Sequence, residues 1–336
     1  MKAVEITGER DCEIVDVPDP RVRGHYVKIR IHSAPLCSEK SYFASGLHVR
    51  DLGHEAAGEV VEAGEKSRIK VGERVALMPT HSCGECYLCM KGDYIHCTSS
   101  VDSLELCHSE TGTSTIAEYC IQQDRLTLPI PDDISYDHAA MACCALGPSF
   151  RACKLMQVNS YDTVLVAGLG AIGLGACINA LYRGARVLAL ETRPYRMELA
   201  RKLGVEVVID PGSDGAMEQI LELTHGKGAD KVIETTDNPN SPPFLIKAVR
   251  GRGEITFISW SGDIPVRGIV GKGLHVHGAW HWNHVTDAPE MLDLIRNSKD
   301  RLDTYITHKF PMSQIKDAWD LQLGGQCGKI ILHPQE

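Results

Sequence analysis

Residues 163–234 impose the strongest constraint on the fold, because short apolar runs alternate there with segments of helical pattern. The runs "TVLVAG", "RVLALE", "VEVVID" and "DKVIETT" read as strands, and helical patterns separate them. Two further runs, "EITFIS" and "LHVHGAW", continue the series. This alternation is typical of a parallel sheet with helices on both faces. We therefore predict a doubly wound α/β domain in this part of the chain.

A glycine loop, Gly168-Leu-Gly170-Ala171-Ile172-Gly173, joins the first of these strands to its helix. Such a pattern is weak evidence alone, but here it stands in the right order between a strand and a helix. Gly168 permits a tight turn, Gly170 lets the backbone approach a pyrophosphate, and Gly173 lets the helix pack on the strand. The helix N-terminus favours an anion. The loop therefore predicts a dinucleotide site.

The end of the next strand carries an acidic residue, Glu191, which lies 18 residues after Gly173. That spacing is close to the roughly 20 residues expected for a carboxylate that binds the adenosine ribose. Such a carboxylate would accept hydrogen bonds from the ribose hydroxyls and would repel a 2′-phosphate, which predicts NAD. Arg193 and Arg196 follow directly and keep NADP as the alternative.

The N-terminal part of the chain has a different pattern. From about residue 1 to 130, short β-rich runs are separated by Gly and Pro, and after about 281 two helical patterns precede a closing strand, "KIILH". We predict a β-rich domain at 1–145, the nucleotide-type domain at 146–280, and a segment at 281–336 that returns to the first domain.

Composition and charge narrow the functional classes. The 336 residues carry a net charge of -9, which argues against a surface for nucleic acid or anionic membrane. No apolar run is long enough to cross a bilayer, and the first residues do not resemble an export signal, so we expect a cytoplasmic protein. Thirteen cysteines are many for such a chain, and their spacing favours metal binding over disulfides.

Four of these cysteines form a local motif, "CGECYLCMKGDYIHC", which contains Cys83, Cys86, Cys89 and Cys97. Four thiolates at this spacing suit tetrahedral zinc and leave no coordination position open. His96 is adjacent to the last cysteine, but a four-sulfur site does not need it. The motif, at about residues 80–100, predicts a structural zinc lobe.

Other candidate ligands are scattered along the chain. Cys37 lies in "SAPLCSEKSYF", His54 and Glu55 in "GHEAAGEV", and Cys143 and Cys144 in "ACCALG". Each of them, taken alone, reads better as a core histidine or as a small buried thiol.

In combination, these segments resemble the medium-chain, zinc-dependent alcohol dehydrogenase family over nearly the whole chain. The resemblance rests on the Cys37 segment, "GHE", the four-cysteine lobe and a cysteine before the glycine-loop half, in that order. It implies a GroES-like β-rich catalytic domain joined to a Rossmann domain. It also implies two zinc ions per chain, a small alcohol or carbonyl substrate, and a homodimer or homotetramer.

The resemblance also implies roles for particular residues. Cys37, His54 and Cys144 match the ligands of a catalytic zinc, with Cys143 as the reserve candidate for the third ligand. Glu55 matches a mobile carboxylate that binds the metal transiently, and Lys329, in "CGKIIL", matches a basic position that holds the cofactor pyrophosphate. Zinc would then lower the pKa of the alcohol, and the nicotinamide would accept the hydride.

The chain departs from the family pattern just after Cys37. The family usually has Ser or Thr two residues after this cysteine, which starts a proton relay, then Asp, which orients the zinc-bound histidine, and often His at the fifth position. This chain has Glu39, Lys40 and Tyr42 at those positions. Three interpretations remain open, and we favour the first: Glu39 accepts the proton, Glu39 forms an ion pair with structural purpose, or the substrate needs no relay. Ser38 and Ser41 are alternative hydroxyl donors.

A second distinctive segment, "HVHGAWHWNH", is rich in imidazole and indole. Its spacing does not favour a third metal site, and its polar aromatic rings would suit a hydroxylated substrate. We predict a zinc- and NAD-dependent dehydrogenase of secondary alcohols, of polyol, sugar or cyclitol type. The alternatives are a family member that reduces a C=N or conjugated C=C bond, and a cofactor-binding homologue without catalysis.

Overall fold

The computed structural model describes residues 1–259 and 262–336, which form two compact units. The first unit comprises Met1–Cys144, Asn283–Lys299 and Ile306–Glu336, and the second comprises Ala145–Trp282 and Asp300–Tyr305. The sequence analysis places all of 281–336 with the first domain, so Asp300–Tyr305 differs from the prediction. The reason is that helix α12 (Lys299–Tyr305) buries Tyr305, whose hydroxyl donates to the carbonyl of Ala171 in the second unit, at 2.8 Å.

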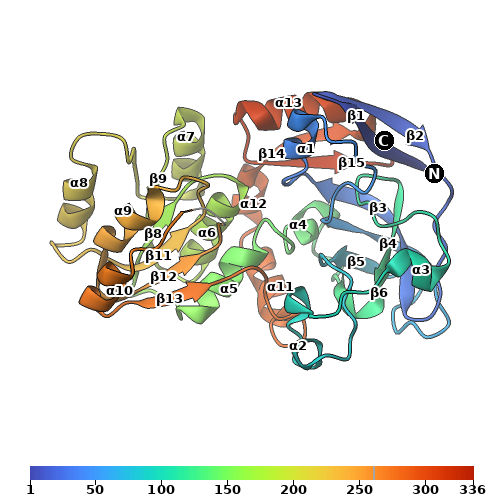
Figure 1. Ribbon diagram of the computed structural model, residues 1–336, viewed down its shortest axis with the longest axis horizontal. Helices are drawn as coiled ribbons and strands as arrows, with labels where there is room; N and C mark the ends of the chain where they lie inside the picture. The colour runs from blue at the N-terminus through green and yellow to red at the C-terminus, as the bar shows by residue number, and fades with distance from the viewer. Residues whose placement is uncertain (260–261) are drawn as a thin grey trace. The chain divides into compact units, whose positions relative to one another are not determined.

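The first unit is rich in short strands, which pair antiparallel except for β14 and β15, which run parallel. A two-stranded sheet pairs β1 with β2, and a seven-stranded sheet has the order β14-β15-β3-β4-β5-β7, with β6 also paired to β3 (Figure 1). The bounds are β1 (Lys2–Gly8), β2 (Asp11–Asp16), β3 (Tyr26–Pro35), β4 (Ala56–Ala63), β5 (Arg74–Leu77), β6 (Tyr119–Gln123), β7 (Thr127–Pro129), β14 (Ile306–Pro311) and β15 (Lys329–His333).

Helices of the first unit are short, and α4 packs on strands β3, β4 and β5. Their bounds are α1 (Lys40–Ser45), α2 (Tyr87–Met90), η1 (Tyr94–His96), α3 (Ser103–Cys107), η2 (Asp124–Leu126), α4 (Tyr136–Ala140), α11 (Ala288–Asn297), η3 (Met312–Gln314) and α13 (Ile315–Gly324). Helix α13 packs on α1 and on strands β14 and β15. Its Trp319, fully buried, lies beside Phe43 of α1, with ring centroids 5.0 Å apart and the ring planes tilted by 31°. The late segment of the chain therefore completes the core of the first unit.

The second unit contains a six-stranded sheet whose strands all run parallel, in the order β10-β9-β8-β11-β12-β13. Numbered within this unit, the order is 3-2-1-4-5-6, which is that of the doubly wound nucleotide-binding fold. The bounds are β8 (Thr163–Ala167), β9 (Arg186–Leu190), β10 (Val207–Ile209), β11 (Ala229–Glu234), β12 (Val249–Phe257) and β13 (His275–Gly278). The predicted fold class, a GroES-like β-rich domain and a Rossmann domain, is confirmed.

Helices cover both faces of this parallel sheet (Figure 1). Helix α6 packs on β8 and β9 and on its neighbours α5 and α7, whereas α9 packs on β11 and β12 beside α8 and α10. The bounds are α5 (Gly147–Leu155), α6 (Ala171–Tyr182), α7 (Pro194–Leu203), α8 (Ala216–Leu223), α9 (Ser241–Ala248) and α10 (Val266–Lys272). Buried aliphatic side chains of the strands, such as Leu165, Leu188 and Val232, form the core. Within the described residues, no helix combines the length and apolar character needed to cross a bilayer.

Candidate metal centres and cofactor loop

A group of four potential metal ligands forms in the first unit where β3 ends and β4 begins. Cys37, His54, Glu55 and Cys144 each offer one ligand atom, and these atoms lie within 4.8 Å of one another. Strands β3 and β4 are antiparallel neighbours, with Ser33 opposite Ala57. Because of this register, the residues that follow β3 meet the residues that precede β4. Cys144 arrives from the segment after α4.

A glycine fixes the turn that presents His54 and Glu55. Gly53 has φ of +84°, and a Cβ at this position would lie 2.4 Å from the hydroxyl oxygen of Thr115. Both the left-handed backbone and the close packing therefore require glycine. The imidazole that follows has its Nε2 3.2 Å from the sulfur of Cys144.

The carboxylate of Glu39 contacts two members of the ligand group, His54 and Cys37. Its Oε1 lies 2.9 Å from Nδ1 of His54, and its Oε2 accepts the backbone N–H of Cys37, also at 2.9 Å. The Glu39 residue is only 3% exposed. Burial by itself would raise the pKa of Glu39, but the hydrogen bonds from His54 and from backbone N–H groups outweigh it and hold this pKa below its ordinary value. The proton-acceptor role of Glu39 stays a prediction, and this arrangement does not favour it.

Glu55 forms an ion pair inside the same cluster. The ammonium of Lys329, on β15, donates to Oε1 of Glu55 at 2.7 Å, and both side chains are almost fully buried. Among the described residues, none hydrogen-bonds to Oε2 of Glu55. Burial raises the pKa of Glu55 to about 8. The contact that we predict between Lys329 and the cofactor pyrophosphate stays a prediction, since this structure shows its ammonium on Glu55.

These donors fit a zinc ion. Two thiols and an imidazole nitrogen converge, and the buried Oε2 of Glu55 is an oxygen for which a cation would supply the missing partner. Hydrogen bonding to Cys144, with burial, raises the pKa of Cys37 to about 12. Zinc binds the thiolate, so binding at this group would release protons. Cys143, the reserve candidate, is not in the group; its sulfur lies 3.6 Å from the carbonyl oxygen of His54.

The second ligand group is the cysteine lobe. The sulfurs of Cys83, Cys86, Cys89 and Cys97 lie within 4.8 Å of one another around α2 and η1. Backbone N–H groups point at these sulfurs, for example that of Cys86 at Cys83 and that of Cys83 at Cys97, both at 3.3 Å. Backbone hydrogen bonds, first that of Cys89, lower the pKa of Cys86 to about 5. Four thiols in a fixed cage fit the structural zinc that we predict. His96 is not a member of the group.

The glycine loop of the second unit has the geometry that its sequence predicts. It follows β8 and opens α6, where Ala171 and Ile172 are the first helical residues. Gly168 has φ of +83°, and a Cβ at Gly173 would lie 1.7 Å from the carbonyl oxygen of Gly168. A Cβ at Gly170 would meet nothing within 4 Å, which leaves open space beside the helix N-terminus. This is the close backbone approach that a pyrophosphate needs.

Glu191 follows β9 and connects that strand to the loop. Its Oε2 accepts the backbone N–H of Leu169 at 2.9 Å, and its Oε1 accepts those of Thr192 and Arg193 at 2.8 and 3.0 Å. The guanidinium of Arg196 lies 4.0 Å from Oε2. A carboxylate has about four acceptor positions, so one remains on Oε2 for a further donor. The Glu191 residue is 8% exposed.

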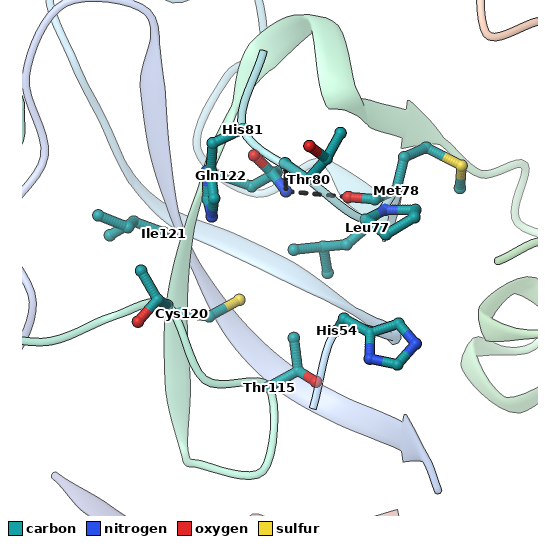
Figure 2. A pocket seen from close by; sticks show the side chains of 11 residues that line it. His54, Leu77, Met78, Thr80, His81, Thr115, Cys120, Ile121 and Gln122 are labelled. Atoms are coloured by element: carbon teal, nitrogen blue, oxygen red, sulfur yellow. Dashed lines mark hydrogen bonds between the residues drawn. The ribbon is translucent and has the colours of Figure 1, made fainter. Parts of the chain in front are cut away.

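A cavity of about 40 Å³ lies beside His54 in the first unit. Figure 2 shows it between Thr80, His81, Thr115, Cys120 and Gln122, with the amide of Gln122 donating to the carbonyl of Met78 at 2.9 Å. Burial lowers the pKa of His81, which favours its neutral imidazole. Among the described residues, no partner is found for Nδ1 of His81 or for the hydroxyl of Thr115.

Sequence reasoning missed three features of this region. It did not identify the bond between Glu39 and His54, the bond from the amide of Gln322 to the carbonyl of Cys37 at 2.9 Å, or the place of Thr115 beside Gly53. Gln322 lies on α13, 285 residues from Cys37, and no local pattern links them. The histidine-rich segment belongs to neither ligand group; His277, for example, lies 2.9 Å from the carboxylate of Glu254.

Comparison with known families agrees with this fold. Residues 23–132 match the family described as the alcohol dehydrogenase GroES-like domain, and residues 171–297 match the zinc-binding dehydrogenase family. The first match lies in the β-rich unit and the second begins at helix α6, just after the first strand of the parallel sheet. The chain belongs to the zinc-dependent medium-chain dehydrogenase family, as the resemblance in the sequence implies.

Individual relatives match along the full length. Sorbitol dehydrogenase of Bacillus subtilis is 25% identical over 350 residues, which cover 99% of this chain and 97% of the relative. The structure of alcohol dehydrogenase TADH from Thermus sp. ATN1 superposes with a TM-score of 0.88 at 22% identity, over 99% of both chains. An Escherichia coli CFT073 protein described as a short chain alcohol dehydrogenase, solved with NADH, has a TM-score of 0.83 at 25% identity over 99% of both chains.

Proposed function

We propose that this chain is a zinc- and NAD-dependent dehydrogenase that oxidises a secondary alcohol of polyol, sugar or cyclitol type, or reduces the corresponding carbonyl. One observation carries the proposal. Cys37, His54 and Cys144 come from three separate segments, yet their ligand atoms meet beside a buried carboxylate oxygen of Glu55 that no described residue satisfies. Three protein ligands around one centre are typical of catalytic zinc, which keeps a position for substrate.

The metal and the protein would divide the work. Zinc, when bound there, would supply a Lewis acid that favours the deprotonated form of an alcohol or polarises a carbonyl in the reverse direction. The residues of this chain set the site around it. Cys37, His54 and Cys144 would hold the ion, the carboxylate of Glu39 contacts the imidazole of His54, and Glu55, paired with Lys329, places a second carboxylate against the ligands.

NAD fits the loop and acid of the second unit. The bound nicotinamide would accept the hydride. The space at Gly170 and the N-terminus of α6 suit the pyrophosphate, and the remaining acceptor position of Glu191 suits a ribose hydroxyl. The charge of Glu191 opposes a 2′-phosphate. The similarity to a protein solved with NADH supports the same choice. Arg193 and Arg196 are the residues on which use of NADP would depend.

A hydroxylated substrate is supported by two observations. One relative along the whole length is a sorbitol dehydrogenase. The cavity beside His54 is lined by Thr80, His81 and Thr115, whose polar groups can exchange hydrogen bonds with hydroxyls. A simple apolar alcohol would leave such groups unsatisfied, which is costly when they are buried.

A second candidate function is the reduction of a C=N or conjugated C=C bond. It is favoured by one feature: position 39 offers no hydroxyl, and its carboxylate is already bonded to His54 and Cys37. A catalytically inactive homologue is less well supported, because the ligand group around Cys37 is complete.

A substrate panel tests the proposal. The zinc-loaded protein is incubated with NAD and with polyols, cyclitols, simple secondary alcohols and primary alcohols, and NADH absorbance is followed. We expect the highest kcat/KM with a polyhydroxylated secondary alcohol. Preference for unbranched apolar alcohols would contradict the substrate class. Activity only with imines or enones and NADH would support the second candidate, and activity with none of these would favour the inactive homologue.

We also propose that the chain assembles as a homodimer or homotetramer. Strand β13 is the outer strand of the parallel sheet, and its His275 and Val276 are exposed. An outer strand with exposed side chains can pair with a second copy. Light scattering at several protein concentrations measures the assembly. A cytoplasmic location stays a prediction.

A further inference from the structure

The carboxylate of Glu39 is held at both ends within the first unit. One oxygen lies 2.9 Å from Nδ1 of His54, and the other accepts the backbone N–H of Cys37 at 2.9 Å. The residue is 3% exposed, so the carboxylate is shielded from bulk water. Glu39 therefore joins two residues of the ligand group that belong to different segments, one after β3 and one before β4.

The contact with His54 decides which ring nitrogen faces the ligand group. A carboxylate only accepts hydrogen bonds, so it selects the form in which Nδ1 carries a proton. The lone pair of Nε2 then faces the sulfur of Cys144, which lies 3.2 Å away. A histidine that binds a metal generally donates its other ring N–H to a carboxylate or carbonyl in this way. The geometry at His54 is that of a metal ligand with its supporting partner.

The contact with Cys37 fixes the second ligand through the backbone. On its other side, the carbonyl of Cys37 accepts a hydrogen bond from Nε2 of Gln322 on α13, at 2.9 Å. The peptide groups on both sides of the Cys37 side chain are therefore held, one by Glu39 and one by Gln322. The thiol is directed at the centre by bonds that do not involve sulfur.

We propose that Glu39 is a positioning residue, which holds His54 and Cys37 in the geometry that binds zinc, and that it does not accept the substrate proton. The inference rests on the catalytic metal centre of the proposed function. In this proposal Glu39 serves to retain the metal, so the proton of the substrate alcohol leaves through other groups. Removal of such a supporting partner typically lowers metal affinity by about 10- to 100-fold.

Glutamine at position 39 separates the two roles. Glu39→Gln keeps the size of the side chain, but its amide has one acceptor oxygen and one donor NH₂ group. It can accept from either His54 or Cys37, and it presents a donor to the other. Glu39→Asp keeps the charge but is one methylene shorter, so it cannot reach both partners. Both variants should weaken zinc retention, and glutamine should weaken it more.

The experiment follows zinc release from the full chain. Wild type, Glu39→Gln and Glu39→Asp are loaded with zinc, counted by metal analysis, and mixed with a colorimetric chelator. The four-cysteine lobe is an internal reference, because it is a separate ligand group and Glu39 binds His54 and Cys37 of the other group. We expect one of the two zinc ions to leave roughly 10- to 100-fold faster in Glu39→Gln, while the other leaves as in wild type. Unchanged release from the lobe also shows that the variant is folded.

A matched control replaces a buried carboxylate elsewhere. Glu234 is fully buried and binds the backbone N–H of Thr236 at 2.7 Å, but it lies in the second unit. Glu234→Gln should leave the release of both zinc ions unchanged. A cobalt-loaded sample adds a spectroscopic readout, since the visible bands of cobalt report ligand geometry. We expect these bands to shift in Glu39→Gln and not in Glu234→Gln.

The outcomes separate this inference from the proposed function. If Glu39→Gln retains both zinc ions with wild-type kinetics and an unchanged cobalt spectrum, Glu39 is not a positioning residue. If in addition its pH–rate profile loses the limb assigned to a base, Glu39 accepts the proton. If wild type itself holds zinc only in the cysteine lobe, the catalytic centre of the proposed function fails first.

Discussion

Two adjacent cysteines differ in whether their side chains join the ligand group around His54. Cys143 and Cys144 are neighbours in sequence, and the family resemblance alone left both as candidates. In the structure, only Cys144 joins Cys37 and His54, whereas the sulfur of Cys143 points at the carbonyl of His54 from 3.6 Å. The two residues therefore form a matched pair for testing the third ligand.

We expect Cys144→Ser to lose one zinc ion per chain and to lower kcat/KM by about 10²-fold or more, the scale on which removal of charge stabilisation acts. Cys143→Ser should keep both ions and most of the activity, because its sulfur is not in the ligand group. Metal analysis and steady-state kinetics measure both effects. The opposite order of the two variants would make Cys143 the ligand.

Glu191 is the residue on which cofactor choice depends. Replacing it with Ser removes the charge that opposes a 2′-phosphate and the acceptor for the ribose. The KM for NAD should rise by about tenfold or more, since a hydrogen bond to a charged group contributes roughly 1.5–3 kcal/mol. Activity with NADP should increase relative to NAD. Kinetics with both cofactors measure this ratio, and a ratio that does not move would remove Glu191 from cofactor recognition.

At the scale of elements, the turn between α1 and β4 sets the position of His54. Gly53 has a positive φ, and a Cβ at this position would meet the hydroxyl of Thr115. Gly72, in the turn before β5, also has a positive φ, of +90°, but a Cβ there would meet nothing within 4 Å. The two glycines share the backbone requirement and differ in packing.

We expect Gly72→Ala to cost about 1–2 kcal/mol of the free energy of unfolding, from backbone strain alone. Gly53→Ala should cost clearly more, because its Cβ would also meet Thr115 at 2.4 Å, and it should weaken zinc retention at His54. Denaturant unfolding of both variants measures the difference. Equal losses would show that the packing against Thr115 relaxes without effect.

An ionic cluster connects α4 to β14 and β15. Asp137 lies 3.0 Å from Nε2 of His333 and 2.6 Å from the ammonium of Lys309. The bond to Asp137 raises the pKa of His333, and although burial alone would raise the pKa of Asp137, its bonds to His333 and Lys309 lower it. These shifts make the stability of this connection depend on pH.

Because the pKa of His333 is higher in the folded protein, protonated His333 stabilises the fold at pH values below its pKa in the unfolded chain, about 6.5. This contribution is lost as the pH rises through the pKa of the folded state. Because the pKa of Asp137 is lower in the folded protein, ionised Asp137 stabilises the fold above about pH 3.9, its pKa in the unfolded chain. This contribution is lost as the pH falls through the pKa of the folded state. The contribution is therefore greatest between about pH 4 and 6.5. The melting temperatures at pH 5.5 and pH 8.5 should differ less in His333→Gln than in wild type. The same difference in both proteins would show that this cluster does not cause the pH dependence of stability.

For the whole molecule, the features that the sequence predicts best are those with local causes. The glycine loop and the four-cysteine lobe each lie within a short segment, so spacing alone indicates the geometry. The alternating strands and helices predict the parallel sheet for the same reason. Cys37, His54 and Cys144 are spread over 108 residues, and only the resemblance to a family connected them.

The interactions that the sequence does not predict depend on how elements pack. Whether Glu39 meets His54 depends on the register of β3 and β4, and whether Gln322 meets Cys37 depends on the docking of α13. The boundary at Asp300–Tyr305 depends on a hydroxyl of Tyr305 that reaches Ala171. These contacts cannot be predicted from the residue types alone.

The central claim is that Cys37, His54 and Cys144 hold a catalytic zinc ion. An anomalous difference map, recorded at the zinc edge from crystals of the zinc-loaded chain, tests it most directly. We predict two peaks per chain, one within bonding distance of Cys37, His54 and Cys144 and one inside the cage of Cys83, Cys86, Cys89 and Cys97. A peak in the cage alone, from protein that is fully active as a dehydrogenase, would contradict the account.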